Sequence, residues 1–194
     1  MKKYGLYLMM VATALFCSTS CGDEEEDNHL ERWMVVNQQA FNAIKTNPEY
    51  KELKSLGNEG SIYYKVLEEG NGTDSIYYTS RIECYYKGWF VANYPELYFE
   101  NGQIFDQTLY NDGTPYNILP GFVTPDGVYK VINGWKTVLQ HMKKGDKWEV
   151  WVPYQLGYGR EGSINNITKK VLIPGYSTLV FEIEVVSVMG IDGK

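Results

Sequence analysis

Three stretches of the chain alternate apolar and polar residues, and this pattern constrains the fold more than any other feature. In residues 81–86, 147–152 and 179–185 every second side chain is apolar or a cysteine. Such alternation is typical of antiparallel strands that bury one face and expose the other. The residues predicted to face inward are Ile82, Cys84 and Tyr86; Trp148, Val150 and Val152; and Leu179, Phe181, Ile183 and Val185. The sequence therefore predicts an antiparallel sheet with one buried face.

One predicted helical segment lies between the first two of these stretches in the sequence. The buried face of the sheet needs such a segment to cover it. Trp135, Val138, Leu139 and Met142 recur at helical spacing. The following Lys143-Lys144-Gly145 is predicted to supply a cationic last turn and a stop. We therefore expect an α+β fold in which one short helix packs onto one face of the sheet.

The segment before the sheet has a different pattern. Residues 28–46 place most of their apolar side chains on one helical face, interrupted by Asn37, which predicts an amphipathic helix. Asn47-Pro48-Glu49 then has the pattern of a helix start and predicts a second short helix that ends near Gly57. We expect residues 28–57 to form a small helical appendage and residues 58–194 to form the folded domain.

The first 27 residues have the composition of an export signal and its junction. Residues 1–20 combine Lys2 and Lys3 with an apolar run and small residues, which is typical of a secretory signal peptide, and the run is too short to span a membrane. The stretch that ends at Cys21 resembles a bacterial lipobox of the Bacteroidetes type, which implies lipid attachment at Cys21. Residues 21–27 would then be a lipidated cysteine and an acidic tether. An ordinary cleaved signal with an incidental cysteine is the alternative.

Charge and composition exclude several functions. The net charge is -6, which argues against nucleic acid as a partner because phosphate binding needs clustered Lys and Arg. The chain has three cysteines, and only Cys84 lies outside the signal region, so no disulfide framework is expected. His29 and His141 are the only histidines, and neither has another metal-binding side chain at the spacing that metal ligands show. We therefore expect no metal and no cofactor.

Several short motifs follow one another along the chain in a fixed order. They are Tyr64-Lys65-Val66-Leu67-Glu68-Glu69-Gly70-Asn71-Gly72, Tyr86-Lys87-Gly88, Phe105-Asp106, Val131-Ile132-Asn133-Gly134-Trp135, Met142-Lys143-Lys144-Gly145, Val152-Pro153, Tyr158-Gly159, Ile173-Pro174 and residues 178–184. Each is weak alone, but the ordered set from about Gly60 to Val188 resembles the FKBP-type peptidyl-prolyl cis-trans isomerases.

The resemblance implies a fold and a site. The fold would be a strongly curved antiparallel β-sheet wrapped around one short α-helix. The site would be an aromatic pocket, and the positions that carry over for substrate binding are Tyr86, Phe105, Tyr116, Val131, Trp135, Ile173 and Phe181. By the same resemblance Trp135 would support the substrate proline ring, and the catalytic groups would be the Ile132 backbone N–H, the Tyr158 hydroxyl and Asp106.

The implied function is a peptidyl-prolyl isomerase of the cell envelope that assists the folding of exported proteins. Its partners would be proline-containing polypeptides and macrolide inhibitors, and it would meet the outer membrane through its lipid anchor only, on the periplasmic or the exposed side. A dimer through the N-terminal helices stays open. The alternative is a weakly catalytic FKBP-like binding module that holds a protein or a glycan at the cell surface.

The chain departs from the family pattern in two ways. The arginine that often pairs with the aspartate of the Phe-Asp element is missing from residues 109–114, which leaves the role of Asp106 open between catalysis and loop capping. Three segments are longer than in a minimal member: residues 90–102, 119–130 and 162–172. The last is expected to overhang the pocket and to influence which partners bind.

Overall fold

The structure is a computed structural model that describes residues 23–77, 80–92, 102–108, 116–118 and 131–189, with residues 23–27 and 116–118 described by their backbone. In chain order the elements are α1 (Asp23–Lys45), β1 (Lys51–Lys54), β2 (Ser61–Glu68), β3 (Arg81–Phe90), β4 (Ile104–Gln107), β5 (Tyr116–Ile118), α2 (Asn133–Leu139), β6 (Lys147–Val152), the 3-10 turn η1 (Tyr154–Leu156), β7 (Ser163–Ile164), β8 (Val171–Ile173) and β9 (Leu179–Met189).

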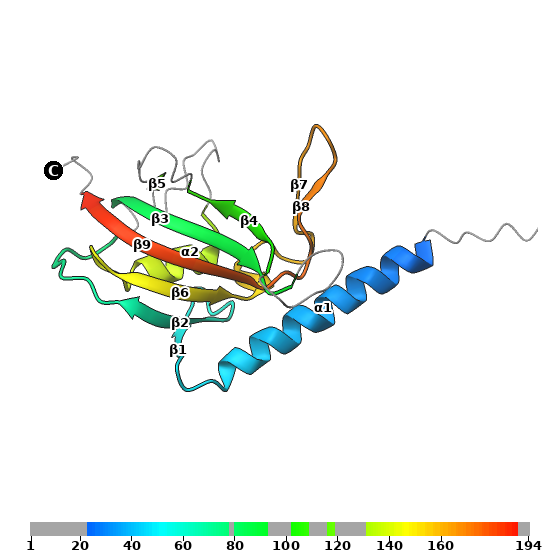
Figure 1. Ribbon diagram of the computed structural model, residues 1–194, viewed down its shortest axis with the longest axis horizontal. Coiled ribbons are helices and arrows are strands. Elements are labelled where there is room, and N and C mark those ends of the chain that lie inside the picture. Colours follow the sequence, from blue (N-terminus) through cyan, green and yellow to red (C-terminus); the bar gives the residue numbers. More distant parts are fainter. Residues whose placement is uncertain (1–22, 78–79, 93–101, 109–115, 119–130, 190–194) are drawn as a thin grey trace, which may run out of the picture.

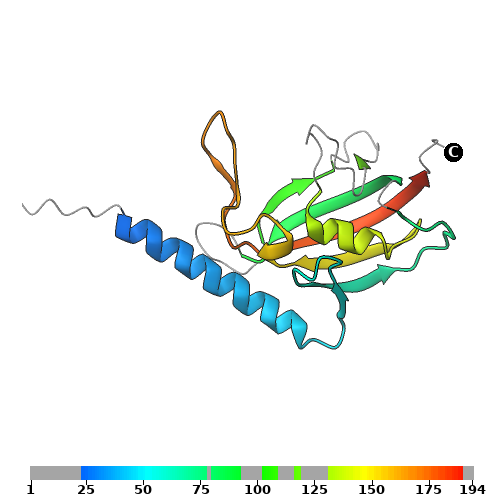
Figure 2. The same ribbon diagram turned by 180° about the vertical axis from the view of Figure 1, so that it is seen from behind.

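The main sheet is antiparallel throughout. Its order is β1-β2-β6-β9-β3-β4, and β5 pairs with β3 beside β4. The short helix α2 lies against one face of this sheet, and the long helix α1 runs along one end of it (Figures 1 and 2). The expected architecture, an antiparallel sheet around one short helix with an N-terminal helix outside it, is confirmed.

The predicted inward faces of β3, β6 and β9 are also confirmed. Every residue that the alternation assigned to the buried face is at most 8% exposed and belongs to one core cluster. A bulge between Glu83 and Cys84 shifts the register of β3 against β9. Burial raises the pKa of the Cys84 thiol to about 12, so the thiol stays protonated and unreactive at neutral pH.

Helix α2 is shorter than the sequence predicted. It ends at Leu139, so Lys143 and Lys144 do not form its last turn. The reason is a competing turn before β6, in which the Asp146 N–H donates to the Lys143 carbonyl at 3.0 Å. Gly145 serves this turn with a φ of +89°, a value that glycine adopts at little cost. The predicted face is nonetheless correct, since Trp135, Val138, Leu139 and Met142 are buried.

The second N-terminal helix does not exist, and the prediction for residues 47–57 was wrong. Asn47 closes a single turn, in which its carbonyl accepts from Tyr50 N–H at 3.1 Å and its side chain from Glu49 N–H at 3.0 Å. Strand β1 follows at once and pairs with β2, Lys51 opposite Tyr64. Asn47-Pro48 fits a turn as well as a helix start, and the free edge of β2 gives the next residues ladder partners that a short helix lacks.

Helix α1 begins earlier than expected. The backbone is helical from Asp23, so residues 23–27, which were predicted to be an acidic tether before the helix, belong to the helix. Acidic residues in a first turn are stabilised by the positive end of the helix dipole, and Glu is a good helix former. Residues 1–22, including the predicted signal peptide and Cys21, lie outside the described residues.

One face of α1 is buried against the domain. Trp33, Phe41 and Ile44 are at most 9% exposed, and Phe41 meets the ring of Tyr63 edge to face at 5.6 Å. Asn37, which interrupts the apolar face in the sequence, has no exposed surface. The helix is therefore packed on the sheet by a face that includes a buried amide.

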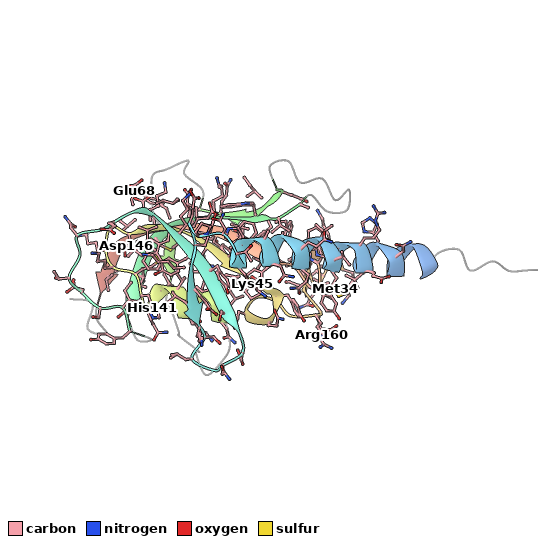
Figure 3. The ribbon with its side chains drawn as sticks, turned by 90° about the horizontal axis from the view of Figure 1, so that it is seen from below. Met34, Lys45, Glu68, His141, Asp146 and Arg160 are labelled. Carbon is pink, nitrogen blue, oxygen red and sulfur yellow. The ribbon has the colours of Figure 1, made fainter. Side chains whose placement is uncertain are left out.

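At the end of the molecule away from α1, backbone segments pack closely. A Cβ on Gly70 would lie 2.2 Å from the Lys144 carbonyl oxygen, and one on Gly72 would lie 2.8 Å from the Lys144 nitrogen. The buried Asp146 carboxylate accepts hydrogen bonds from the Gly70 N–H at 2.7 Å and the Lys143 N–H at 2.8 Å. The motifs at residues 64–72 and 142–145 meet here, and their role is structural. Figure 3 shows Asp146 at this end and Arg160 at the other.

The longer segment at residues 162–172 forms the hairpin of β7 and β8, which projects from the body of the molecule (Figure 1). Its exposed aliphatic side chains are Ile164, Ile167, Val171 and Leu172, and Ile167 is 92% exposed. The other two long segments fall almost wholly outside the described residues. Among the described helices, none combines the length and apolarity that a membrane crossing requires.

Candidate active site

The centre of the candidate site is Trp135, the third residue of α2. The ring of Tyr86 from β3 stands perpendicular to it at a centroid distance of 5.2 Å, and the ring of Phe181 from β9 does the same at 5.3 Å. Phe105 from β4 meets Phe181 edge to face at 5.6 Å. Four elements thus bring four predicted residues into one aromatic cluster, with Trp135 as the base and the other rings as walls. Figure 2 shows α2 in front of the central strands of the sheet.

Two motif glycines make room for this cluster. A Cβ on Gly88 would lie 2.7 Å from the Phe105 ring and 2.8 Å from the Phe181 ring. A Cβ on Gly134 would lie 2.4 Å from a methyl group of Val152. Larger side chains at these positions would displace the rings or lift α2 from the sheet.

A polar group lies at the rim of the cluster. The Tyr86 hydroxyl donates a hydrogen bond of 2.8 Å to Oδ2 of Asp106, whose side chain is otherwise exposed. The missing arginine therefore does not leave this carboxylate without a partner. The bond also fixes the Tyr86 ring, because its far end is tied to β4 while its body packs on Trp135.

Tyr158 lies just after η1, and the charge of the same carboxylate acts on its phenol. Its side chain is 41% exposed. Burial of the phenol and the negative charge of Asp106 raise the pKa of Tyr158 above its usual value of 10.0. The hydroxyl therefore keeps its proton at neutral pH and can donate a hydrogen bond to a ligand.

Ile132 is the residue that precedes α2. Its carbonyl accepts the first helical bonds, from Trp135 N–H at 3.0 Å and Lys136 N–H at 3.2 Å, and its backbone is extended. Within the described residues its own N–H has no acceptor. Val131 and Ile132 pack against the core cluster, and Ile173 at the end of β8 is 5% exposed within it.

Tyr116 is placed by its backbone, which pairs with Cys84 across β3 and β5. The side chain is outside the described part, as is Cys21. The structure therefore brings together Tyr86, Phe105, Asp106, Trp135 and Phe181 by direct contact, and it links Tyr158 to them through the charge of Asp106.

Sequence reasoning missed Phe90, which it assigned to a longer segment. Phe90 is the last residue of β3, is 3% exposed, and stacks at a tilt on Phe105 at 4.9 Å. The sequence pattern could have identified Phe90 as buried, because the alternation of Ile82, Cys84 and Tyr86 continues to this residue.

A separate cavity of about 260 Å³ lies between α1, the β1–β2 turn and η1. Its lining includes Met34 and Lys45 of α1, which Figure 3 labels, and none of the ten predicted pocket residues. Within the described ranges no group of three or more His, Cys, Asp or Glu side chains is arranged to hold a metal ion.

Known proteins match both the sequence and the fold. The FKBP-type peptidyl-prolyl cis-trans isomerase family matches residues 75–186. The FK506-binding protein of Neisseria meningitidis is 32% identical over 129 residues, which is 66% of this chain and 97% of that protein. The FKBP-type 22 kDa peptidyl-prolyl cis-trans isomerase of Escherichia coli is 26% identical over 159 residues, which is 82% of this chain and 64% of that protein.

A crystal structure of a peptidyl-prolyl cis-trans isomerase from Pseudomonas syringae superposes with a TM-score of 0.59 and 28% identity, over 81% of this chain and 94% of that one. The family match covers more than half of the chain and includes all four rings of the aromatic cluster. The chain belongs to the FKBP-type peptidyl-prolyl cis-trans isomerases.

Proposed function

We propose that this isomerase acts on proline-containing segments of exported polypeptides, and that the aromatic cluster around Trp135 is where the Xaa-Pro bond turns. The observation that carries the proposal is the pair of perpendicular rings, Tyr86 and Phe181, that flank Trp135. A proline ring is compact and apolar, and such a base with upright walls can hold it.

The physical problem is a resonance barrier. Rotation about the Xaa-Pro bond costs about 18 to 20 kcal/mol, while the cis and trans forms differ by only about 1 kcal/mol. A catalyst must therefore bind the twisted amide better than either planar form. Resonance makes the imide carbonyl polar in the planar forms, so withdrawal of water by an apolar pocket disfavours them relative to the twisted amide.

Three polar groups complete the proposed chemistry. The protonated Tyr158 hydroxyl donates to a substrate carbonyl, and the Ile132 N–H donates to another. Asp106 holds Tyr86 through its 2.8 Å hydrogen bond and acts on the substrate through that ring. Removal of about 3 to 5 kcal/mol from the barrier corresponds to an acceleration of about a hundredfold to several thousandfold. Proton transfer and metal chemistry are not needed.

The proposed location is the outer membrane, with Cys21 as the lipid attachment site. It is supported by the signal-like composition of residues 1–20 and by the small residues before Cys21. Mass spectrometry of the chain isolated from membranes tests this point, because a diacylated N-terminal Cys21 is expected. An unmodified mature N-terminus elsewhere would contradict it.

A second candidate function is a binding module with weak turnover. The observation that favours it is the projecting β7–β8 hairpin, whose aliphatic side chains are exposed to solvent. Such a surface can hold an apolar segment of a partner without any rotation of a peptide bond.

Exchange NMR on a short Xaa-Pro peptide separates the two functions. The full-length chain is expected to accelerate exchange in proportion to its concentration. Tyr158→Phe should lower kcat/KM by about tenfold, the equivalent of about 1.4 kcal/mol, because one donor is lost while the ring stays. Trp135→Ala should nearly abolish peptide binding. Binding of proline peptides without acceleration would favour the module over the enzyme.

A further inference from the structure

A continuous series of ring contacts connects α1 to the candidate active site. Trp33 of α1 meets Phe90 edge to face at 5.7 Å, and Phe90 lies 4.9 Å from Phe105. Phe105 then meets Phe181, which meets Trp135. Every step lies within the range of favourable aromatic contacts. The buried face of α1 is therefore packed against the same aromatic cluster that holds the site.

Hydrogen bonds between α1 and one loop of the domain accompany this packing. The Asn37 side chain donates to the Trp33 carbonyl at 2.8 Å and accepts from the Thr178 N–H at 2.7 Å. The Thr178 hydroxyl donates to the Asn37 carbonyl at 3.2 Å. The Trp33 indole donates to the Ser177 hydroxyl at 3.1 Å, which donates to the Pro174 carbonyl at 2.7 Å. We call Trp33, Asn37, Ser177 and Thr178 the clamp; all four are buried.

The loop that the clamp holds, residues 174–178, joins two walls of the site. It begins after Ile173, the last residue of β8, and ends before β9, which carries Phe181. In its middle, Tyr176 has a φ of +61° and its N–H donates to the Gly159 carbonyl at 3.0 Å, next to Tyr158. A bulky residue keeps such a backbone conformation only where its surroundings enforce it.

We propose that Asn37 and Trp33 are positioning residues of the isomerase site. The clamp fixes the 174–178 loop, and the loop sets where Ile173, Phe181 and Tyr158 stand around Trp135. Without Asn37 the buried Thr178 N–H loses its acceptor, and the loop must move to find another partner. This proposal rests on the proposed function of the pocket residues, and it makes α1 a part of the site although no α1 residue touches the substrate.

The rival explanation is that α1 only adds stability. Phe41 provides a matched control, because it lies one turn beyond Asn37 on the same buried face and packs on Tyr63 of β2. Phe41→Leu weakens the docking of α1 but leaves the clamp in place. Asn37→Leu keeps the number and the branching of the side-chain heavy atoms and removes the hydrogen bonds of the Asn37 side chain. We expect both variants to lower the stability of the folded chain, but only Asn37→Leu removes a hydrogen bond to the 174–178 loop.

The experiment uses the full-length chain and its Asn37→Leu, Trp33→Phe and Phe41→Leu variants, each at a temperature at which circular dichroism shows it fully folded. Exchange NMR gives kcat/KM for an Xaa-Pro peptide, and ¹H–¹⁵N spectra report the Phe181 amide and the Trp135 indole. Asn37→Leu should lower kcat/KM by about tenfold to a hundredfold and shift both signals, as expected for a small displacement of a binding wall. Trp33→Phe keeps a ring against Phe90 and loses one hydrogen bond, so its effect should be smaller. Phe41→Leu should stay within about twofold, as for a residue remote from the chemistry.

Unchanged kcat/KM and unshifted signals in Asn37→Leu and Trp33→Phe would overturn the proposal, and so would an equal loss of activity in Phe41→Leu. If Asn37→Leu does not fold, Trp33→Phe against Phe41→Leu decides in the same way. A wild-type chain without any acceleration would refute the proposed function instead. The shifts of Phe181 and Trp135 would then decide whether the clamp positions these side chains.

Discussion

The two ends of the sheet are held together in different ways, although each contains a glycine of a family motif. At the end with the candidate site, Gly88 lies against the rings of Phe105 and Phe181, which are side chains that can tilt. At the opposite end, Gly70 lies against the backbone of Lys144 and Asp146, which cannot yield without breaking the turn before β6. The same residue type therefore leaves room for the rings of the candidate site at one end and for a backbone turn at the other.

The largest effect on stability is expected from Gly70→Ala. The new methyl group would lie 2.2 Å from the Lys144 carbonyl oxygen and 2.5 Å from the Asp146 nitrogen. We expect the free energy of unfolding in urea to fall by about 3 kcal/mol, the upper range for overpacking. The folded fraction should keep its kcat/KM. A loss of activity in the fully folded variant would contradict the assignment of a purely structural role to Gly70.

Gly88→Ala is expected to have the opposite profile. Its methyl group meets ring edges at 2.7 and 2.8 Å, so Phe105 and Phe181 can move aside. The free energy of unfolding should fall by about 1 kcal/mol, while kcat/KM falls by about tenfold or more because two walls of the site are displaced. Unfolding in urea and peptide exchange measure the two quantities. Unaltered catalysis with a large loss of stability would contradict the assignment.

Asp146→Asn tests the polar contact at the stable end. The carboxylate accepts from Gly70 and Lys143, and an amide can accept only one of these bonds with its oxygen. The free energy of unfolding should fall by about 2 kcal/mol, the scale of one bond to a charged group. Asp74→Asn, at an exposed position, serves as the control and should have almost no effect. Equal unfolding curves for the two variants would show that Asp146 does not hold this turn.

The smallest effect is a pH dependence at the site. Burial and the charge of Asp106 raise the pKa of Tyr158 above 10.0, so the hydroxyl donor should persist to pH 10 and disappear above it. The raised pKa also means that the stability contributed by this group is complete below pH 10 and is lost as the pH rises through the folded value. A fall of kcat/KM centred below pH 10 that is absent in Tyr158→Phe would contradict this.

Much of this arrangement was predictable from local patterns. The period of two identified the buried faces of β3, β6 and β9, and the family motifs identified the rings around Trp135. The errors arose where a short signal had two interpretations. Asn47-Pro48-Glu49 fits both a helix start and a turn, and only the free edge of β2 decides between them. Such a partner is not visible in a local window.

The clamp could not be predicted for a different reason. Its hydrogen bonds between α1 and the loop join pairs of residues that are separated by 144 and by 141 positions in the sequence. No periodicity indicates a pair so distant. In the sequence Asn37 interrupts an apolar face, and a buried amide cannot be told from an exposed one when its hydrogen-bond partner is unknown. In the structure the nitrogen and the oxygen of this amide each have a hydrogen-bond partner, and the oxygen joins α1 to the 174–178 loop.

The most direct test of the central claim is to locate a bound proline. Intermolecular nuclear Overhauser effects between the ring protons of an Xaa-Pro peptide and the full-length chain report which side chains it touches. We predict contacts to the rings of Trp135, Tyr86 and Phe181 under conditions in which the chain accelerates exchange. Contacts confined to the β7–β8 hairpin or to the cavity beside α1, with none to Trp135, would contradict the assignment of the aromatic cluster as the active site.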